Sequence, residues 1–327
     1  MTFDYATAVL RNSGYIAAET QEKIRSTTLL IAGCGIGSSL AVCATRMGFE
    51  HFVLVDGDVV DAHNLNRQFY DFSDVGRPKV EALKEQILRI NPQACVDAIQ
   101  ENLTIDNTDR IVGKVDMVLD TVDFLDLPAI LDLHDSAKRH KVHMLTALSV
   151  GFGALVWYFP ADSSLTLADI LAPDSAAASA AASAATTSAP SYADVFASFI
   201  QRIAPYLDRE VVLQVGKVLT MMKNGKPCPA SQVAVGSFAI AAMALSMMHD
   251  VLAGNPVPSA PKLVIPVSKS AMQQPETRPV HADWHSLYRS IHALFYALRY
   301  RRVVDEINYS MEQIWKKFNR ICLHLDS

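Results

Sequence analysis

The 327-residue sequence has few cysteines, and these few form no pattern. They are scattered and odd in number, with no C-x-x-C pair among them: Cys34, Cys43, Cys95, Cys228 and Cys322. Such a set argues against a disulfide framework and against a four-cysteine zinc site. We therefore expect a reducing, cytoplasmic location and no bound zinc.

The sequence also lacks an excess of positive charge, a leader-like start and a long unbroken apolar run. Its formal net charge of −5 offers no general attraction for nucleic acid or for an anionic membrane. Residues 1–15 contain no basic stretch followed by an apolar one, so we expect no signal peptide. The longest apolar run, 233–248, is interrupted by Gly236 and Ser237 and is shorter than the roughly 20 residues of a membrane span. It predicts a buried helix, and we expect neither a nucleic acid nor a membrane as partner.

Between residues 28 and 159, short β-branched runs alternate with helical stretches. The expected strands are 28–33, 51–56, 115–120, 141–147 and 154–159, and the expected helices are 38–47, 79–90 and 127–140. This alternation predicts an α/β fold with a doubly wound, mostly parallel, Rossmann-like sheet. In such folds the ligand crevice lies at the carboxyl ends of the strands, so functional residues should follow each strand.

The remainder of the sequence changes character several times. An Ala/Ser-rich stretch at 175–191 predicts a mobile crossover loop, and apolar spacing predicts a helix at 208–223. Proline-rich residues 256–267 predict an edge strand, and residues 283–325 predict amphipathic helices. We therefore expect four parts: a nucleotide-binding core (1–160), a crossover region (161–207), helices and an edge strand that complete the domain (208–268), and a helical C-terminal extension (269–327).

A glycine-rich loop lies between the first predicted strand and its helix. Gly33, Gly35 and Gly37 are followed by Ser38, so the pattern is G-x-G-x-G and lacks the third glycine of G-x-G-x-x-G. Glycines in this context let backbone N–H groups approach a phosphate at a helix N-terminus. Asp56 ends the next strand about 20 residues later, where an acidic side chain binds a ribose hydroxyl. A nucleotide site is favoured over a purely structural turn.

Polar side chains then gather between the second strand and the next helix: Asp56, Asp58, Asn64, Arg67, Gln68 and Lys79. The planar guanidinium of arginine and the point charge of lysine suit the β- and γ-phosphates of ATP. Asp120 and Asp123 follow the next strand, and their carboxylate oxygens suit Mg²⁺. These residues predict an ATP–Mg²⁺ site. An NAD-dependent oxidoreductase and a non-catalytic binding module remain as alternatives.

Together these motifs resemble the ThiF/MoeB/HesA family of ubiquitin-activating-like adenylyltransferases, over about residues 10–160. The motifs are the glycine loop, D-x-D at 56–58, N-L-N-R-Q at 64–68, G-x-P-K ending at Lys79 and D-x-x-D at 120–123. The resemblance implies that ATP–Mg²⁺ is bound and that a substrate carboxylate attacks the α-phosphate. The products would be an acyl adenylate and pyrophosphate.

The resemblance also implies roles by position. Asp56 would hold the ribose, Asn64, Arg67 and Gln68 the phosphates, Lys79 the developing charge, and Asp123 the Mg²⁺, with Asp120 as a supporting acid. Phe124 stands where the family commonly has asparagine. Family sites are completed across a two-fold axis, which implies a homodimer in which Arg11 is the nearest candidate for a residue donated by the partner.

Two questions stay open at this stage. Cys228 resembles a crossover-loop cysteine that receives the acyl group in some members, and Lys226 could favour its thiolate, but Pro227 and Pro229 also suit a cysteine that simply packs. The substrate could be the C-terminus of a ubiquitin-fold sulfur carrier, or a ribosomal peptide, as in the ThiF-like enzymes of microcin C and pantocin maturation. The missing zinc pairs and the helical tail favour the peptide.

Overall fold

The computed structural model describes residues 2–124, 126–171, 207, 209–223 and 231–264. The chain divides into two compact units, residues 1–179 with 232–273 and residues 180–231 with 274–327. In the second unit, the described helix is α10 (Arg209–Lys223), close to the predicted 208–223. The predicted loop at 175–191, Cys228 and the predicted helices at 283–325 lie outside the described residues. The four-part division stays a prediction.

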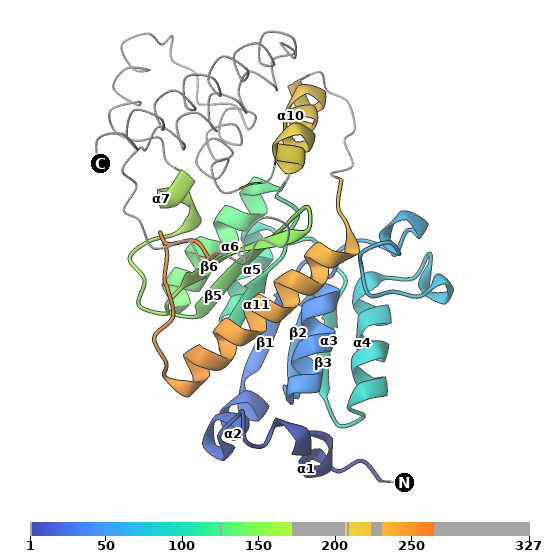
Figure 1. The fold of residues 1–327 in the computed structure, drawn as a ribbon, viewed down its shortest axis with the longest axis vertical. Helices are drawn as coiled ribbons and strands as arrows, with labels where there is room; N and C mark the ends of the chain where they lie inside the picture. The colour runs from blue at the N-terminus through green and yellow to red at the C-terminus, as the bar shows by residue number, and fades with distance from the viewer. Residues whose placement is uncertain (1, 125, 172–206, 208, 224–230, 265–327) are drawn as a thin grey trace, which may run out of the picture. The chain divides into compact units, whose positions relative to one another are not determined.

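The first unit is built on a six-stranded sheet (Figure 1). Its strands are β1 (Thr28–Ala32), β2 (His51–Val55), β3 (Cys95–Ile99), β4 (Met117–Asp120), β5 (His143–Val150) and β6 (Gly153–Phe159). The order across the sheet is β3-β2-β1-β4-β5-β6, and every neighbouring pair is parallel except β5 and β6. The predicted doubly wound, mostly parallel α/β fold is confirmed.

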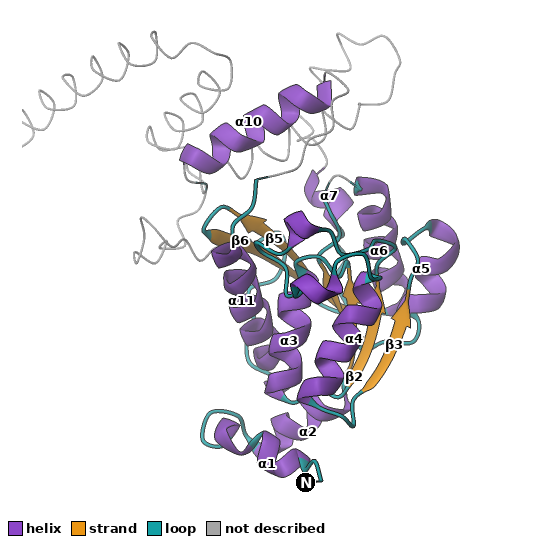
Figure 2. Cartoon of the chain, turned by 90° about the vertical axis from the view of Figure 1, so that its right-hand side faces the viewer, coloured by secondary structure: helices purple, strands orange, loops and turns teal. Residues whose placement is uncertain are grey.

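Two layers of helices cover the sheet (Figures 1 and 2). On one face lie α3 (Gly37–Met47), α4 (Lys79–Ile90) and α11 (Ala234–Ala253); on the other lie α5 (Ile105–Val112) and α6 (Leu127–His140). Burial on both faces explains why β1 and β4 read as continuous apolar runs, a pattern typical of central parallel strands. Buried residues of β1, β2, α3, α4 and α11 form one core cluster.

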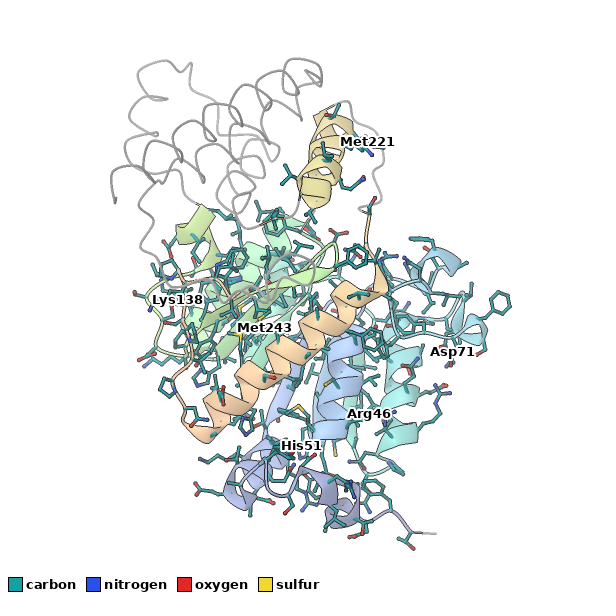
Figure 3. All side chains as sticks on the ribbon, viewed as in Figure 1. Arg46, His51, Asp71, Lys138, Met221 and Met243 are labelled. Atoms are coloured by element: carbon teal, nitrogen blue, oxygen red, sulfur yellow. The ribbon has the colours of Figure 1, made fainter. Side chains whose placement is uncertain are left out.

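The long helix α11 was predicted from the apolar run at 233–248 and extends five residues further. By length and composition it is the one helix among the described residues that could cross a membrane. It contacts α3 and the antiparallel pair β5–β6 (Figure 3, in which Arg46 marks α3 and Met243 marks α11). Its inward face is buried at Ile240 and Ala244. The predicted buried helix is therefore confirmed only for this face, because Val235 and Phe238 on α11 are 47% and 59% exposed.

Three short N-terminal helices precede the sheet: α1 (Tyr5–Ala8), η1 (Leu10–Asn12) and α2 (Ala18–Ser26). Hydrogen bonds fix them to the end of α3. Asn12 and Gln21 each donate to the carbonyl oxygen of Met47, at 3.1 and 2.9 Å, and the Tyr5 hydroxyl donates to that of Gly48 at 2.9 Å. Because β1 begins directly after α2, this segment lies at the amino ends of the strands (Figure 1).

The proline-rich segment was predicted as an edge strand. Its described part makes one antiparallel bridge, between Val264 and Val156 of β6, and the Ala260 N–H donates to the carbonyl oxygen of Tyr158 at 2.8 Å. The segment therefore lies along the outer edge of β6. Residues 265–267 of the predicted strand lie beyond the described part of the chain.

Candidate nucleotide site

The glycine loop joins the end of β1 to the start of α3. Gly33 has φ = +84°, and a Cβ there would lie 2.7 Å from the carbonyl oxygen of Thr121, so only glycine suits this position. A Cβ on Gly37 would lie 2.5 Å from Thr121 Oγ1, and one on Gly35 would lie 3.2 Å from Gln68 Nε2. The loop is thus cradled by the turn after β4 and by the segment that carries Gln68.

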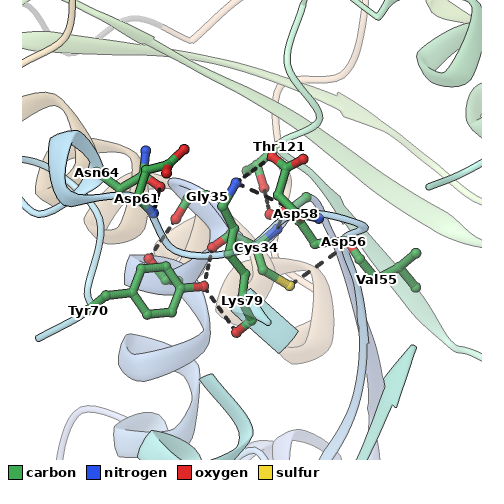
Figure 4. A network of polar contacts seen from close by, with 12 residues as sticks. Cys34, Gly35, Val55, Asp56, Asp58, Asp61, Asn64, Tyr70, Lys79 and Thr121 are labelled. Atoms are coloured by element: carbon green, nitrogen blue, oxygen red, sulfur yellow. Dashed lines mark hydrogen bonds and ion pairs between the residues drawn. The ribbon is translucent and has the colours of Figure 1, made fainter. Parts of the chain in front are cut away.

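Asp56 follows β2 and closes one side of this loop (Figure 4). Its Oδ2 accepts from the backbone N–H of Cys34 at 2.7 Å, and its Oδ1 accepts from that of Asp58 at 2.8 Å. Burial raises the pKa of Asp56, and the nearby positive charge of Lys79 opposes that rise. The carboxylate is therefore fixed beside the loop, at the position where a ribose acceptor is predicted.

Lys79 is the first residue of α4 and is only 6% exposed. Its Nζ lies 2.6 Å from Asp58 Oδ2 and 3.9 Å from Asp56 Oδ1 (Figure 4). The structure thus brings Asp56, Asp58 and Lys79 together at the mouth of the loop. Asp58 is largely exposed and forms an ion pair with the ammonium group of Lys79.

Arg67 is held by neutral oxygens. Its Nε donates to Gln232 Oε1 at 2.5 Å, and its NH1 donates to the carbonyl oxygen of His63 and to Asn66 Oδ1, each at 2.9 Å. Partial burial lowers the pKa of Arg67, and the charge of Asp123 opposes that change. Arg67 and Asp123 therefore lie near enough to interact across the crevice.

Gln68 and Asn64 come from the same segment, but their side chains differ in their hydrogen bonds. Gln68 is buried beside Gly35, and its Oε1 has no hydrogen-bond partner in the described structure. Asn64 is buried as well, but its Oδ1 accepts from the N–H of Asp61 at 3.0 Å and so caps the helix η2 (Ala62–Asn64). The Gln68 amide group lies beside the loop, and its Nε2 is the group that can donate to a phosphate, whereas the side chain of Asn64 shapes the loop.

The two aspartates after β4 separate in the structure. Asp120 is 1% exposed, its Oδ1 accepts from the N–H of Val122 at 3.1 Å, and its Oδ2 lies 3.7 Å from His134 Nε2. It faces the interior, so Asp123 is the carboxylate at the carboxyl edge. No group of three His, Cys, Asp or Glu residues is placed to hold a metal in the described ranges. The Mg²⁺ assignments stay predictions.

Cys34 lies in the glycine loop and is completely buried. Burial raises its pKa well above the usual value of a thiol, which disfavours the nucleophilic thiolate. It serves as a small spacer in the loop.

Sequence reasoning missed several residues that hold the loop. The Tyr70 hydroxyl donates to the carbonyl oxygen of Cys34 at 2.7 Å, and the Thr121 hydroxyl donates to that of Gly33 at 2.6 Å. Gln232, the partner of Arg67, is 165 residues away along the chain. The only sequence signal for Tyr70 and Thr121 was their place next to predicted site residues.

Four buried side-chain atoms within the described ranges have no hydrogen-bond partner: Gln68 Oε1, Asp120 Oδ2, Ser149 Oγ and Ser237 Oγ. They come from different parts of the sheet and its helices: Gln68 lies beside the glycine loop, Asp120 faces His134 from β4, and Ser149 and Ser237 belong to β5 and α11.

The loop between β1 and α3, the acidic residue after β2 and the cations beside them define a nucleotide-binding α/β protein. The comparison with family models narrows this class. Residues 9–281 match the model of the ThiF family, so the chain belongs to the ThiF family.

Curated relatives match a smaller share of the chain. Ubiquitin-like modifier-activating enzyme 5 of Caenorhabditis elegans is 36% identical over 114 residues, which span 31% of this chain and 27% of that protein. The sulfur carrier protein ThiS adenylyltransferase of Escherichia coli is 30% identical over 140 residues, 42% of this chain and 55% of that protein. The matches thus span about a quarter to about half of the relatives' lengths.

Solved structures share the fold over more of the chain. E. coli MccB with succinimide has a TM-score of 0.58 at 17% identity, covering 82% of this chain and 70% of its own. PaaA has a TM-score of 0.55 at 19% identity, covering 80% and 77%. At these identities the likeness shows the fold alone.

Proposed function

We propose that this protein is an ATP-dependent adenylyltransferase that activates a carboxylate of a peptide or small protein as an acyl adenylate. One observation carries the proposal: the buried Lys79 and Asp56 lie together beside a glycine loop that is held against the turn after β4. Membership of the ThiF family and the similarity to a ThiS adenylyltransferase support the same reaction.

The residues present fit ATP. The loop offers backbone N–H groups at the start of α3, Asp56 offers a fixed acceptor for the ribose, and Gln68 Nε2 offers an amide donor beside Gly35. Arg67 and Lys79 supply positive charge for the phosphates. Asp123 would hold the Mg²⁺, which would screen the phosphate charges when bound.

In the proposed reaction a carboxylate oxygen of the substrate attacks the α-phosphorus of ATP. The bond between that phosphorus and the bridging oxygen breaks, and the electron pair leaves with pyrophosphate. Arg67 and Lys79 would stabilise the negative charge that gathers on the leaving group, because fixed charges in a shielded site act strongly on developing charge.

We favour a peptide as substrate. The fold resembles that of MccB, which has been solved together with MccA, and no C-x-x-C pairs are present in the sequence. The alternative, a ubiquitin-like or sulfur-carrier protein, is favoured by the curated relatives. Cys228 belongs to this proposal as a possible acceptor of the acyl group.

We further propose a cytoplasmic homodimer. The segment carrying Arg11 is fixed by Asn12 and Gln21 to the far end of α3, at the amino ends of the strands. The crevice of the same chain lies at the opposite edge of the sheet. An arginine of this segment could reach a nucleotide only in a second copy, as a two-fold dimer would allow.

The test is pyrophosphate release with ATP and Mg²⁺. Short peptides with free C-terminal carboxylates and a ubiquitin-fold protein ending in Gly-Gly would be tried separately, with mass spectrometry to detect the adenylate. Arg67→Ala and Asp123→Ala should each lose about 10²- to 10³-fold in rate, whereas Arg110→Ala, exposed on α5, should not.

Cys228→Ala should still release pyrophosphate in a first turnover if the cysteine acts only in a later transfer. If the protein bound NAD but not ATP, the result would favour the alternative that it is an oxidoreductase. If the Asp123→Ala and Lys79→Ala variants both released pyrophosphate at the full rate, the adenylation mechanism would be wrong.

A further inference from the structure

A groove lies beside the nucleotide site, between α3, α4, the start of α11 and the segment 65–71. Its volume is about 600 Å³. All of these elements belong to the first unit of the chain and lie on the face of the sheet that carries α11 (Figure 3, where Arg46 and Asp71 of the lining are labelled). Sites that hold ligands commonly measure about 300–1,000 Å³, so the groove is large enough to be one.

The lining of the groove is largely apolar. Each of the four segments contributes at least one apolar side chain: Val42, Leu65, Phe69, Ile90 and Phe238. The rings of Phe69 and Phe238 lie edge to face with their centroids 5.0 Å apart, which ties the segment 65–71 to α11. Phe238 nevertheless stays 59% exposed. A large aromatic side chain left open to water beside a concave apolar surface is typical of an interaction site.

The apolar surface continues past the groove. Val235 precedes Phe238 by three residues, so it lies on the same side of α11, and it is 47% exposed. Phe72, which directly follows the lining residue Asp71, is 83% exposed. A surface helix normally carries polar side chains on its exposed face. The exposed apolar groups on α11 therefore indicate a face that another molecule covers.

The charged groups in the lining are mostly positive. Arg46 of α3, Arg89 of α4 and Arg67 line the groove, against a single acid, Asp71. Arg46 and Arg89 are both exposed, and neither makes a hydrogen bond or an ion pair with another residue in the described part of the chain. The chain as a whole has a formal net charge of −5, so this positive groove is a local feature that suits an acidic partner.

The walls of the groove indicate the shape of that partner. They are helices and a loop, and no strand edge lines the groove among the described residues, so a bound chain cannot be added to the sheet as a further strand. An amphipathic helix that lays its apolar face into a hydrophobic groove is a recurring mode of recognition that fits such walls. A lipid bilayer presents a broad surface, which would meet the rim of the groove rather than its floor.

Charge separates the possible sources of such a helix. Residues 283–325 of this chain contain seven Lys and Arg against four Asp and Glu, so they would bring more positive charge to the arginines. Residues 2–26, which a second copy could present, are balanced, with three acidic and three basic residues. A different protein with an excess of acidic residues therefore matches the groove best.

We propose that this groove is a docking site for an acidic amphipathic helix of a partner protein. The apolar face of that helix would cover Phe69 and Phe238, and its acidic side chains would pair with Arg46 and Arg89. Aromatic residues and arginine often dominate the binding energy of protein interfaces. The inference does not rest on adenylation, because Phe238, Arg46 and Arg89 have no part in the proposed reaction.

Three helical peptides test the groove without knowledge of the natural partner. Each has about 18 residues, with leucine at positions i, i+3, i+4 and i+7 along one face. The positions that flank this face are all glutamate, all glutamine or all lysine. Acetyl and amide groups at the ends remove the terminal carboxylate on which the proposed adenylation would act. Fluorescence anisotropy would measure their affinities for the full chain at about 50 mM and about 500 mM salt.

The acidic peptide should bind about tenfold more tightly than the glutamine peptide at low salt, and this preference should shrink at high salt. Phe238→Ser should weaken its binding about tenfold. The double variant Arg46→Glu/Arg89→Glu should lose the acidic peptide and bind the lysine peptide instead, an exchange that misfolding cannot produce. Ile105→Ser and Arg110→Glu, both exposed on α5 at the other face of the sheet, are the matched controls and should change neither affinity.

Equal affinities for the three peptides, no binding of the acidic peptide, or unchanged binding in the groove variants would overturn the proposal. Two further results would overturn it in favour of another occupant. If Phe238→Ser turned a dimer of the full chain into a monomer in sedimentation, a second copy would cover the groove. If vesicles of phosphatidylcholine and phosphatidylglycerol bound the full chain but not the charge-reversed variant, a membrane would cover it.

Affinity for ATP would be measured for the same variants and should be unchanged. A chain that binds the acidic peptide but not ATP would leave the docking site standing while the proposed function fails. A chain that binds ATP but does not distinguish the peptides would overturn the docking site alone.

Discussion

Lys79 Nζ lies 2.6 Å from Asp58 Oδ2 and 3.9 Å from Asp56 Oδ1, so one buried cation faces two carboxylates of different character. Asp56 is fixed by two backbone N–H groups and is nearly buried. Asp58 is exposed and free to turn toward solvent. A phosphate can therefore replace Asp58 at the ammonium group while Asp56 keeps its place beside the loop.

Replacing Lys79 with alanine should slow pyrophosphate release about 10²- to 10³-fold, because a fixed charge is removed from the place where negative charge develops. Lys84→Ala is the control, since Lys84 lies on the same helix, α4. Circular dichroism would verify that both variants are folded. A rate near that of the unaltered protein would remove Lys79 from the mechanism.

Replacing Asp56 with asparagine should weaken ATP binding about ten- to a hundredfold, the usual worth of hydrogen bonds to a charged group. The same substitution should scarcely affect 2′,3′-dideoxy-ATP, which lacks the hydroxyls that Asp56 is proposed to bind. Calorimetry with both nucleotides checks this, with Asp97→Asn on the exposed edge of the sheet as control. Equal losses for both nucleotides would contradict the ribose assignment.

Alkylation should distinguish Cys34 from Cys95. Burial closes Cys34 to reagents and raises its pKa, whereas Cys95 is exposed on β3. In the native protein at neutral pH, iodoacetamide should modify Cys95 and leave Cys34 intact, and denaturant should make both react. Peptide mapping by mass spectrometry measures this, and modification of native Cys34 at the rate of Cys95 would show that the loop opens.

The link between α5 and α6 should give stability that depends on pH. Hydrogen bonds, chiefly from Arg139 and then from Ser136, lower the pKa of Asp109 to about 2. Since the folded pKa is below the usual value, the stabilisation is complete above about pH 4 and is lost as the pH falls toward 2.

Asp109→Asn should therefore lower the melting temperature at pH 7, modestly because the pair is exposed. The difference from the unaltered protein should shrink between about pH 4 and pH 2. Thermal melts across this range measure it, and a difference that stays constant with pH would show that the charge of Asp109 is irrelevant.

The sequence predicts those helices, strands and turns whose local residue pattern is strong. The apolar runs of β1 and β4, the glycine loop after β1 and the helix beginning at Lys79 were all recognisable because burial on both faces and turn chemistry leave clear signals. The strand β3 was missed because it lies at the sheet edge, where its residues are partly exposed and Cys95 and Asp97 interrupt the apolar pattern.

The site was harder to predict than the fold. Spacing placed Asp56, Arg67 and Lys79 in one crevice, but it could not show that Asp120 turns toward His134. Nor could it pair Arg67 with Gln232, since only folding brings residues 165 positions apart into contact. Contacts of this kind depend on the packing of α11 against α3, which no local motif encodes.

The anchoring of the N-terminal segment has a mechanical consequence. α3 begins at the glycine loop and ends at Met47, whose carbonyl oxygen Asn12 and Gln21 bind, and its 11 residues form a rod of about 16 Å. Because α3 is held at both ends, we expect a truncation that removes Asn12 and Gln21 to loosen α3 and, through it, the phosphate loop. The first 21 residues thus help to position the crevice, although they lie at the opposite edge of the sheet.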